Sequence, residues 1–310
     1  MYIQYIKYIA LTVALFLLSI FLINYFIDPL SYIRANTSYT YFSTERNLKP
    51  KMLEVKQYDG LIMGSSKVAY IHPEDINIDD KILNASFSGA LPEEILLFLQ
   101  EEKPKVKWIA IGFDWYMFNE DIKPYEVNGT FQKSNTDILK YLMSFDAIRY
   151  SIISIIKKIY NELPKYAKGG NRISKHQEKK DSQKTIYSDE SILAELSDKH
   201  INTFKVSELR LQDIVKIQRW ASNNNIFLVG WVNPYSKDVL ELMQKKLDKE
   251  TLLLPKKLST RVSNFIDLSA SYQDRNLYWN SDPIHYYPSF GGVFFNKHII
   301  PMINSNFESR

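Results

Sequence analysis

The stretch Gly60–Val68 reads G-L-I-M-G-S-S-K-V, and the fold can be inferred outward from it. Three apolar residues, Leu61 to Met63, lead without a break into Gly64 and the hydroxyls of Ser65 and Ser66. A short apolar run that ends at a glycine predicts a buried strand followed by a tight turn. Ligands of open α/β sheets bind at the carboxyl ends of the strands, so this turn is a candidate site.

A serine in such a turn has two interpretations. Rigid backbone and nearby N–H groups suit a nucleophile, because its attack creates an oxyanion that those groups stabilise. A lone G-S-S is more often an ordinary polar turn, since so short a motif recurs by chance. Residues near the C-terminus favour the nucleophile.

Apolar runs and helical patterns alternate along the chain. The runs typical of buried strands are Leu61–Met63, Ile82–Ala85, Trp108–Ile111, Ile226–Val232 and Phe265–Leu268. Helical patterns cover Pro92–Glu102, Thr203–Asn223 and Ser236–Lys249. This alternation predicts an α/β fold, a three-layer doubly wound parallel sheet with helices on both faces, over residues 59–303.

The region at about 120–190 interrupts this alternation and reads as an insertion. Residues Asp137–Tyr160 predict one long, largely apolar helix, for which core packing is favoured over contact with a membrane partner. Residues Lys165–Lys184 are polar and basic, which predicts a mobile loop. We expect a solvated insertion here; the alternative is contact with anionic headgroups or an anionic polymer.

Composition excludes several classes of function. The 310 residues include 39 basic and 35 acidic side chains, and a net charge of +4 gives no indication of nucleic-acid binding. The chain has no cysteine, so disulfides, thiolate metal sites and cysteine nucleophiles are excluded. The absence of cysteine is compatible with an oxidising compartment.

Residues 1–28 predict a transmembrane anchor. The run Tyr8–Ile27 carries no charge, and twenty helical residues span about 30 Å, the thickness of a bilayer core. A cleaved signal peptide is disfavoured because the bulky Asn24, Tyr25 and Phe26 stand where small cleavage-site residues belong. A buried core helix is disfavoured because the run lacks a polar face.

Residues 29–58 then read as a membrane-proximal linker. Lys7 and Arg34 flank the span and give little charge asymmetry, so the orientation is not fixed by charge. We take the N-terminus to lie in the cytoplasm. The chain is then expected to be a single-pass protein of the inner (cytoplasmic) membrane, with its large domain on the periplasmic or extracellular face.

The C-terminal stretch Tyr278–Gly292 reads Y-W-N-S-D-P-I-H-Y-Y-P-S-F-G-G. Asp282 and His285 are three residues apart, and Pro283 keeps the segment from being plain helix. This spacing lets the carboxylate accept from one imidazole nitrogen while the other faces outward, as a Ser-His-Asp relay requires. A histidine bonded to a local aspartate for structural reasons is the alternative.

Four blocks occur in the order seen in the SGNH (GDSL-type) hydrolases, and residues 59 to 300 resemble that superfamily. The blocks are G-S-S, N-A-S-F-S-G at Asn84–Gly89, I-G-F-D at Ile111–Asp114, and D-P-I-H. The single N-terminal span, the G-S-S form of the first block and Val232-Asn233-Pro234 are most similar to the membrane-anchored, extracytoplasmic branch. These DltD-like and alginate-acetylation-like proteins work beside membrane-bound O-acyltransferases on cell-envelope polymers.

The resemblance implies roles for individual residues. Ser66 matches the nucleophile, His285 the general base and Asp282 the acid that orients it. The N–H of Ser66 would supply one oxyanion donor. No metal or other cofactor is implied.

Three further residues fall at the family's substrate-binding positions. Ser86 stands where the second block usually has its oxyanion glycine, and Gly89 matches that block's closing glycine. Asp114 departs from the family, which carries an asparagine that helps to hold the oxyanion. A carboxylate aimed at the site would repel the developing charge. We expect Asp114 to be turned away and to hold a loop; the alternatives are that it is protonated or that the site is weakened.

The expected activity is two-step acyl transfer by a serine O-acyltransferase or esterase. The anchor favours transfer of an acetyl or D-alanyl group to an envelope polysaccharide or teichoic acid, with a membrane-bound O-acyltransferase as partner. A tethered carbohydrate esterase is the first alternative. A non-catalytic scaffold or glycan-binding protein of the same fold is the second.

Overall fold

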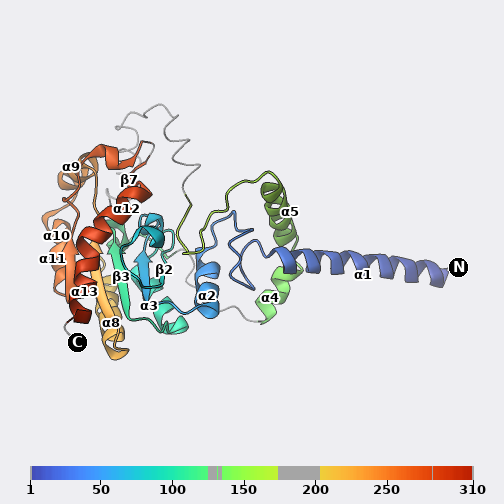
Figure 1. Cartoon of the computed structure of the whole chain (residues 1–310). Coiled ribbons are helices and arrows are strands. Elements are labelled where there is room, and N and C mark those ends of the chain that lie inside the picture. The colour runs from blue at the N-terminus through green and yellow to red at the C-terminus, as the bar shows by residue number, and fades with distance from the viewer. Residues whose placement is uncertain (1, 125–130, 132–134, 174–202, 281, 309–310) are drawn as a thin grey trace.

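A computed structural model describes residues 2–124, 131, 135–173, 203–280 and 282–308 (Figure 1). Its centre is a five-stranded parallel sheet of order β2-β1-β3-β4-β5. The strands are β1 (Gly60–Gly64), β2 (Ile82–Asn84), β3 (Trp108–Phe113), β4 (Phe227–Val232) and β5 (Asn264–Asp267). Each lies within two residues of a predicted run, so the predicted strand positions are confirmed. The prediction that all five are buried was wrong for β5, which is only partly buried at the edge of the sheet.

Helices cover both faces of this sheet (Figure 1). Side chains alternate along a strand, so Leu61 and Met63 of β1 join one apolar cluster and Ile62 joins the other. The first cluster includes side chains of α3 (Pro92–Glu102), α8 (Glu208–Asn223) and α9 (Lys237–Lys246). The second includes side chains of α12 (Pro288–Phe294), the π-helical η6 (Phe295–Ile299) and α13 (Ile300–Glu308).

The remaining elements are short or lie at the periphery. Near the sheet they are η1 (Val68–Tyr70), η2 (Pro73–Asp75), η3 (Trp115–Phe118), α10 (Lys249–Leu252), α11 (Leu254–Ser259) and η5 (Arg275–Leu277). A separate antiparallel pair consists of β6 (Tyr278–Trp279) and β7 (Asp282–Tyr286). Nearer the N-terminus are α1 (Tyr2–Ile27), α2 (Glu45–Val55), α4 (Asn135–Leu142) and α5 (Phe145–Ile159).

The strand order places the G-S-S turn at a switch point. From β1 the chain runs outward to β2 and then returns to β3 on the other side of β1. The carboxyl ends of β1 and β3 therefore adjoin where the winding reverses, which is where ligands bind in such sheets. Gly64 pairs with Gly112, and a Cβ on Gly64 would lie 2.6 Å from the Gly112 carbonyl. Glycine thus allows the strand ends to approach closely.

The insertion differs from the prediction of one long helix. Two helices, α4 and α5, take its place, and Ser144 separates them. The Ser144 hydroxyl accepts the N–H groups of Asp146 and Ala147, so it caps a new helix rather than continuing the old one. The prediction that this region packs in the core was also wrong in part, because the side chains of Ile152 and Ile156 on α5 are exposed.

The helix α1 projects from the rest of the molecule (Figure 1). It is long and apolar enough to cross a membrane, and it is the one such helix in the described part of the chain. Its last turns pack on the insertion: the Asn24 amide donates to the carbonyls of Leu142 (3.0 Å) and Ser144 (3.2 Å). The Ser151 hydroxyl donates to Asn24 Oδ1 at 3.0 Å.

The segment predicted as a linker contains α2, whose Leu48 and Met52 are part of the core. Residues 165–173, the described part of the predicted basic loop, pack against α2. Buried Lys49 of α2 donates to the carbonyls of Asn84 (2.6 Å) and Gly170. The rest of that loop lies outside the described residues.

Candidate active site

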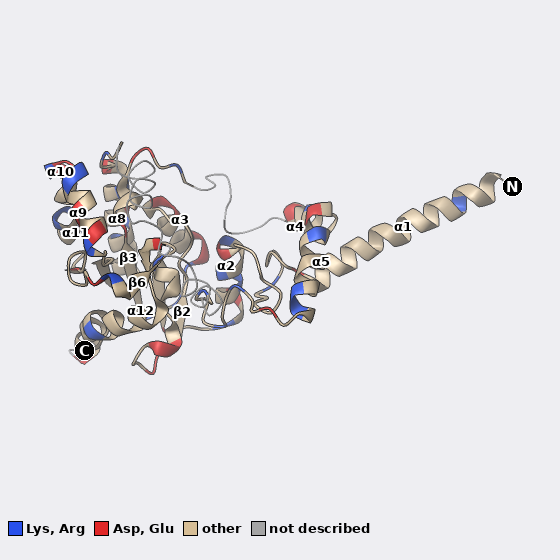
Figure 2. Ribbon diagram, turned by 90° about the horizontal axis from the view of Figure 1, so that it is seen from above, with Lys and Arg blue, Asp and Glu red and all other residues tan. Residues whose placement is uncertain are grey.

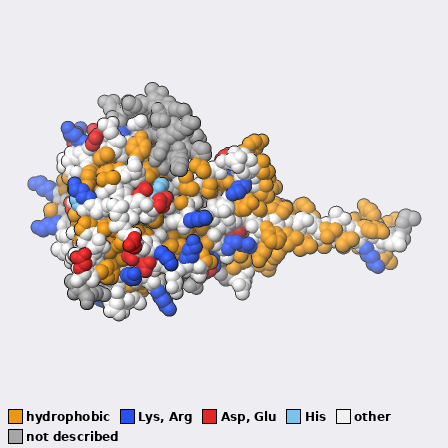
Figure 3. All heavy atoms as spheres, in the orientation of Figure 1, with side chains coloured by type: hydrophobic (Ala, Val, Ile, Leu, Met, Phe, Trp, Pro, Cys, Tyr) orange, Lys and Arg blue, Asp and Glu red, His pale blue; other side chains and the backbone are white. Residues whose placement is uncertain are grey.

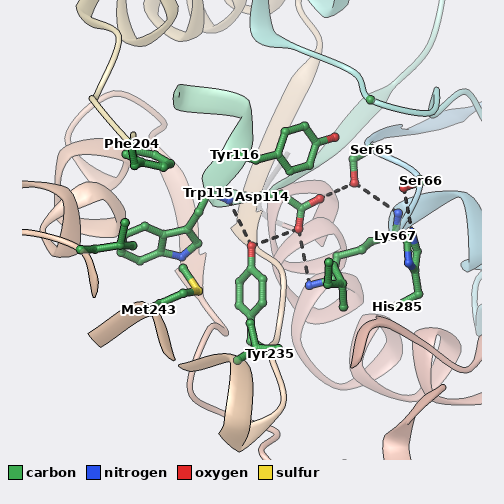
Figure 4. Close-up of a pocket in the computed structure, with 14 residues that line it drawn as sticks. Ser65, Ser66, Lys67, Asp114, Trp115, Tyr116, Phe204, Tyr235, Met243 and His285 are labelled. Carbon is green, nitrogen blue, oxygen red and sulfur yellow. Dashed lines mark hydrogen bonds and ion pairs between the residues drawn. The ribbon is translucent and has the colours of Figure 1, made fainter. Parts of the chain in front are cut away.

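Ser66, His285 and Asp282 form a hydrogen-bonded chain at the carboxyl end of β1. Figure 4 shows Ser66 and His285 facing each other. The Ser66 hydroxyl lies 2.8 Å from His285 Nε2, and His285 Nδ1 lies 2.6 Å from Asp282 Oδ2. Serine and histidine are 219 residues apart in the sequence. Hydroxyl, imidazole and carboxylate thus stand in the order and at the distances that a serine nucleophile and its base require.

The β6–β7 pair presents the histidine to the serine. Asp282 and His285 both lie on β7, so the prediction that Pro283 excludes plain helix is confirmed. The Asp282 carboxylate also accepts the N–H of Ile284 at 3.0 Å, which fixes the carboxylate beside its own strand. The rings of Tyr70 and Trp279 lie 5.9 Å and 6.4 Å from the imidazole. These contacts orient the histidine.

Asp282 stays ionised at neutral pH. Burial raises the pKa of its carboxyl, but the charge of His285, the hydrogen bond from its ring and two backbone N–H groups outweigh burial. The pKa falls to about 2. A carboxylate is therefore available to hold the Nδ1 proton and to stabilise an imidazolium.

Ser66 and Gly89 both line the pocket, so their backbone N–H groups are the candidates for binding an oxyanion. Gly89 has a positive φ of 64°, and a Cβ there would meet nothing within 4 Å. Its backbone is therefore open to a ligand. Ser86 is not brought to this pocket: it is fully buried, and its N–H and hydroxyl both donate to Asn84 Oδ1.

Asp114 lies in the pocket wall, but its carboxylate is held by other protein groups (Figure 4). It accepts hydrogen bonds from the Ser65 hydroxyl, from Asn233 Nδ2 (3.2 Å) and from the Tyr235 hydroxyl (3.2 Å). These bonds tie the turn after β1 to the ends of β3 and β4. The geometry fits the expectation that Asp114 holds a loop.

Lys67 completes this network, and the sequence analysis missed it. Its buried ammonium lies 3.6 Å from Asp114 Oδ1 and 3.5 Å from the centre of the Tyr235 ring, and it donates to the Pro234 carbonyl at 3.0 Å. Burial lowers the pKa of Lys67 to about 8, although Asp114 acts against burial. The one available signal was a charged residue directly after two turn serines that follow a buried strand.

A pocket of about 230 Å³ opens beside Ser66 and His285. Figure 4 shows these two residues on one side, Asp114 and Tyr235 in the middle, and Phe204, Trp115 and Met243 on the other side. Much of the pocket lining is apolar or aromatic: Trp115, Phe204, Val239, Met243, Leu247 and Ile284. An uncharged, apolar group attached to the reacting carbon fits such a wall.

The other two described histidines, His72 and His298, do not join this site. His72 contacts the Arg172 carbonyl at 3.1 Å, and His298 contacts the Tyr272 hydroxyl at 2.8 Å. His176 and His200 lie outside the described residues. Within the described ranges, no three His, Cys, Asp or Glu side chains are grouped to hold a metal ion.

Comparison with known proteins gives no independent assignment. No family model matches the chain, and no curated protein has significant sequence similarity to it. Any function must therefore be argued from the sequence motifs and from the geometry of the site.

Proposed function

We propose that this chain is a membrane-anchored, extracytoplasmic serine acyltransferase with an SGNH-like three-layer fold. The observation that carries the proposal is the Ser66–His285–Asp282 chain of hydrogen bonds, 2.8 Å and 2.6 Å long, beside an apolar pocket. The parallel sheet with its switch point at the G-S-S turn supports the same class.

The reaction proceeds in two steps. His285 takes the hydroxyl proton of Ser66 while Oγ attacks the carbonyl carbon of an acyl donor, and the N–H groups of Ser66 and Gly89 bind the oxyanion. The tetrahedral intermediate collapses to an acyl-serine, and the imidazolium returns its proton to the leaving group. An acceptor hydroxyl, deprotonated by His285, then attacks the acyl-serine. The bond between the acyl carbon and Ser66 Oγ breaks, and the imidazolium returns the proton to Oγ.

The pocket favours an uncharged acyl group over D-alanyl. An ammonium group placed against the apolar walls loses its hydration, and the Asp114 carboxylate of this pocket is already engaged by other protein groups. The buried cation of Lys67 also lies in the same pocket. A cavity of roughly 150 Å³ holds benzene in another protein. At about 230 Å³, this pocket holds acetyl and has room for longer apolar acyl groups.

The anchor favours transfer over hydrolysis. Tethering by α1 would hold the site beside a membrane-borne acyl donor and an envelope polysaccharide or teichoic acid. A membrane-bound O-acyltransferase is the expected partner, and the domain would lie on the outer face of the cytoplasmic membrane.

The test is acyl-ester turnover by the full chain in detergent with p-nitrophenyl acetate, butyrate and D-alanyl ester substrates. We expect Ser66→Ala to lose at least about 10³-fold in kcat, as nucleophile deletions do in serine enzymes. Ser259→Ala, at an exposed helix end, should leave turnover unchanged. Added acceptor polysaccharide should capture the acyl group; release of free acid alone would indicate the esterase.

Wild-type turnover that survives in Ser66→Ala would contradict the proposal. The non-catalytic scaffold of the same fold would then be the better account. Preferred use of the D-alanyl ester would contradict the assignment of the acyl group and leave the nucleophile in place.

A further inference from the structure

One face of α5 is apolar and exposed, which is unusual for a soluble surface. At 100° per residue, the side chains of Phe145, Ile152, Ile156 and Ile159 fall within an arc of about 60°. Each is about half exposed or more. The opposite face carries small buried residues, Ala147, Ser151 and Ser154. The helix therefore packs through its small residues and turns its large apolar ones outward.

The packed face of α5 lies against α1. Ser151 donates to Asn24, and Asn24 holds the Ser144 carbonyl at the start of α5. Phe21 of α1 packs on the cluster formed by Tyr141, Leu142 and Ala147. Figures 1 and 2 both place α4 and α5 at the end of α1 that adjoins the large domain.

This contact sets the depth of α5 relative to the apolar span. Ile20 and Asn24 are the buried residues of α1, and both belong to the uncharged run that ends at Ile27. At 1.5 Å per residue, Ile20 lies only about 10 Å from the end of that run. An amphipathic helix in the membrane interface buries its apolar face to a similar depth, about 5–10 Å.

The charged side chains of α4 and α5 are compatible with a position of these helices at the membrane interface. The exposed cations Lys140, Arg149 and Lys158 outnumber the exposed carboxylates Asp137 and Asp146 on these helices. Figure 2 shows both blue and red segments there. Long basic side chains reach anionic headgroups while the helix body stays in the apolar layer. Figure 3 shows hydrophobic side chains along α1 and over α5, on the same side of the molecule.

We infer that the α4–α5 pair lies in the membrane interface, with the outer face of α5 against lipid acyl chains. The inference rests on the proposed anchor, since α1 must cross the bilayer for α5 to reach this depth. Two elements then contact lipid, so the large domain is held at one height and tilt above the membrane rather than on a free tether.

Depth-dependent quenching tests this inference, and the cysteine-free chain is suited to it. The full chain with Ile156→Cys is labelled with bimane and reconstituted, one copy per nanodisc, in phosphatidylcholine and phosphatidylglycerol. A fraction of the lipid carries a nitroxide near the top of the acyl chain. Leu18→Cys on α1 is the control for the anchor, and Leu209→Cys, exposed on α8, is the control for the water-facing domain.

We expect bimane at residue 156 to lose at least about half as much fluorescence as bimane at residue 18, because both sit among acyl chains. Bimane at residue 209 should lose none. Quenching at 18 but not at 156 would overturn the inference and leave the anchor intact, whether water or a protein covers α5. Failure of quenching at both 18 and 156 would overturn the anchor as well.

Discussion

At the scale of single residues, the site contains two carboxylates, Asp282 and Asp114, that differ in their hydrogen-bond partners. Asp282 is bonded to the imidazole and is kept ionised, with a pKa of about 2. Asp114 is bonded instead to Ser65, Asn233 and Tyr235. One carboxylate thus orients the imidazole of His285, and the other holds together the strand ends beside Ser66.

Replacement of Asp282 tests the first of these roles. In Asp282→Asn the amide can donate to Nδ1, so the imidazole takes the wrong tautomer and cannot accept the Ser66 proton. We expect kcat to fall by about 10²–10⁴-fold with little change in KM. Asp79→Asn, an exposed carboxylate, is the matched control in steady-state ester hydrolysis. A kcat for Asp282→Asn within twofold of the wild type would remove Asp282 from the relay.

At the scale of elements, an ion pair fastens α2 to residues 165–173 and to the loop before α3. Arg172 contacts the Glu45 carboxylate, which also accepts the Ser88 hydroxyl at 2.8 Å. Burial raises the pKa of Glu45, but the charge and hydrogen bonds of Arg172 outweigh burial and hold it at about 2. Because the folded pKa is lowered, the stabilisation is present above the unfolded value near pH 4.5 and is lost as the pH falls toward 2.

Glu45→Gln should therefore destabilise the fold at pH 7 and matter progressively less in acid. A difference of about two pKa units corresponds to about 3 kcal/mol in the free energy of unfolding at pH 7. Urea unfolding in detergent, followed by tryptophan fluorescence between pH 7 and pH 2.5, measures the difference. Glu54→Gln, an exposed partner of Lys51, should have no such effect. A Glu45→Gln difference that is constant with pH would contradict this account.

At the scale of the whole molecule, the sequence predicted the parts that depend on local pattern. The strands of the parallel sheet are short apolar runs, so all five of them were placed, and the D-x-x-H spacing identified Asp282 and His285. The break at Ser144 was missed because apolar periodicity continues through it, and only the cap reveals it. Lys67 and Tyr235 were missed because their meeting at Asp114 depends on how β1, β3 and β4 align.

The same limit applies to the surfaces of the molecule. Residues Asp137–Tyr160 predicted a largely apolar helix, but only the packing of Ser151 on Asn24 shows which face of α5 is turned outward. Ser86 matched an expected block, yet the Asn84 side chain occupies both of its donors. Such contacts depend on tertiary structure and cannot be predicted from the spacing of residues in the sequence.

The central claim is that Ser66 is a nucleophile activated by His285, and covalent labelling tests it most directly. The full chain is treated with a fluorophosphonate, and the modified residue is located by mass spectrometry of its peptides. We predict one adduct, on Ser66, that is absent in His285→Ala. An unreactive chain, or an adduct on neighbouring Ser65, whose hydroxyl is bonded to Asp114, would contradict the account.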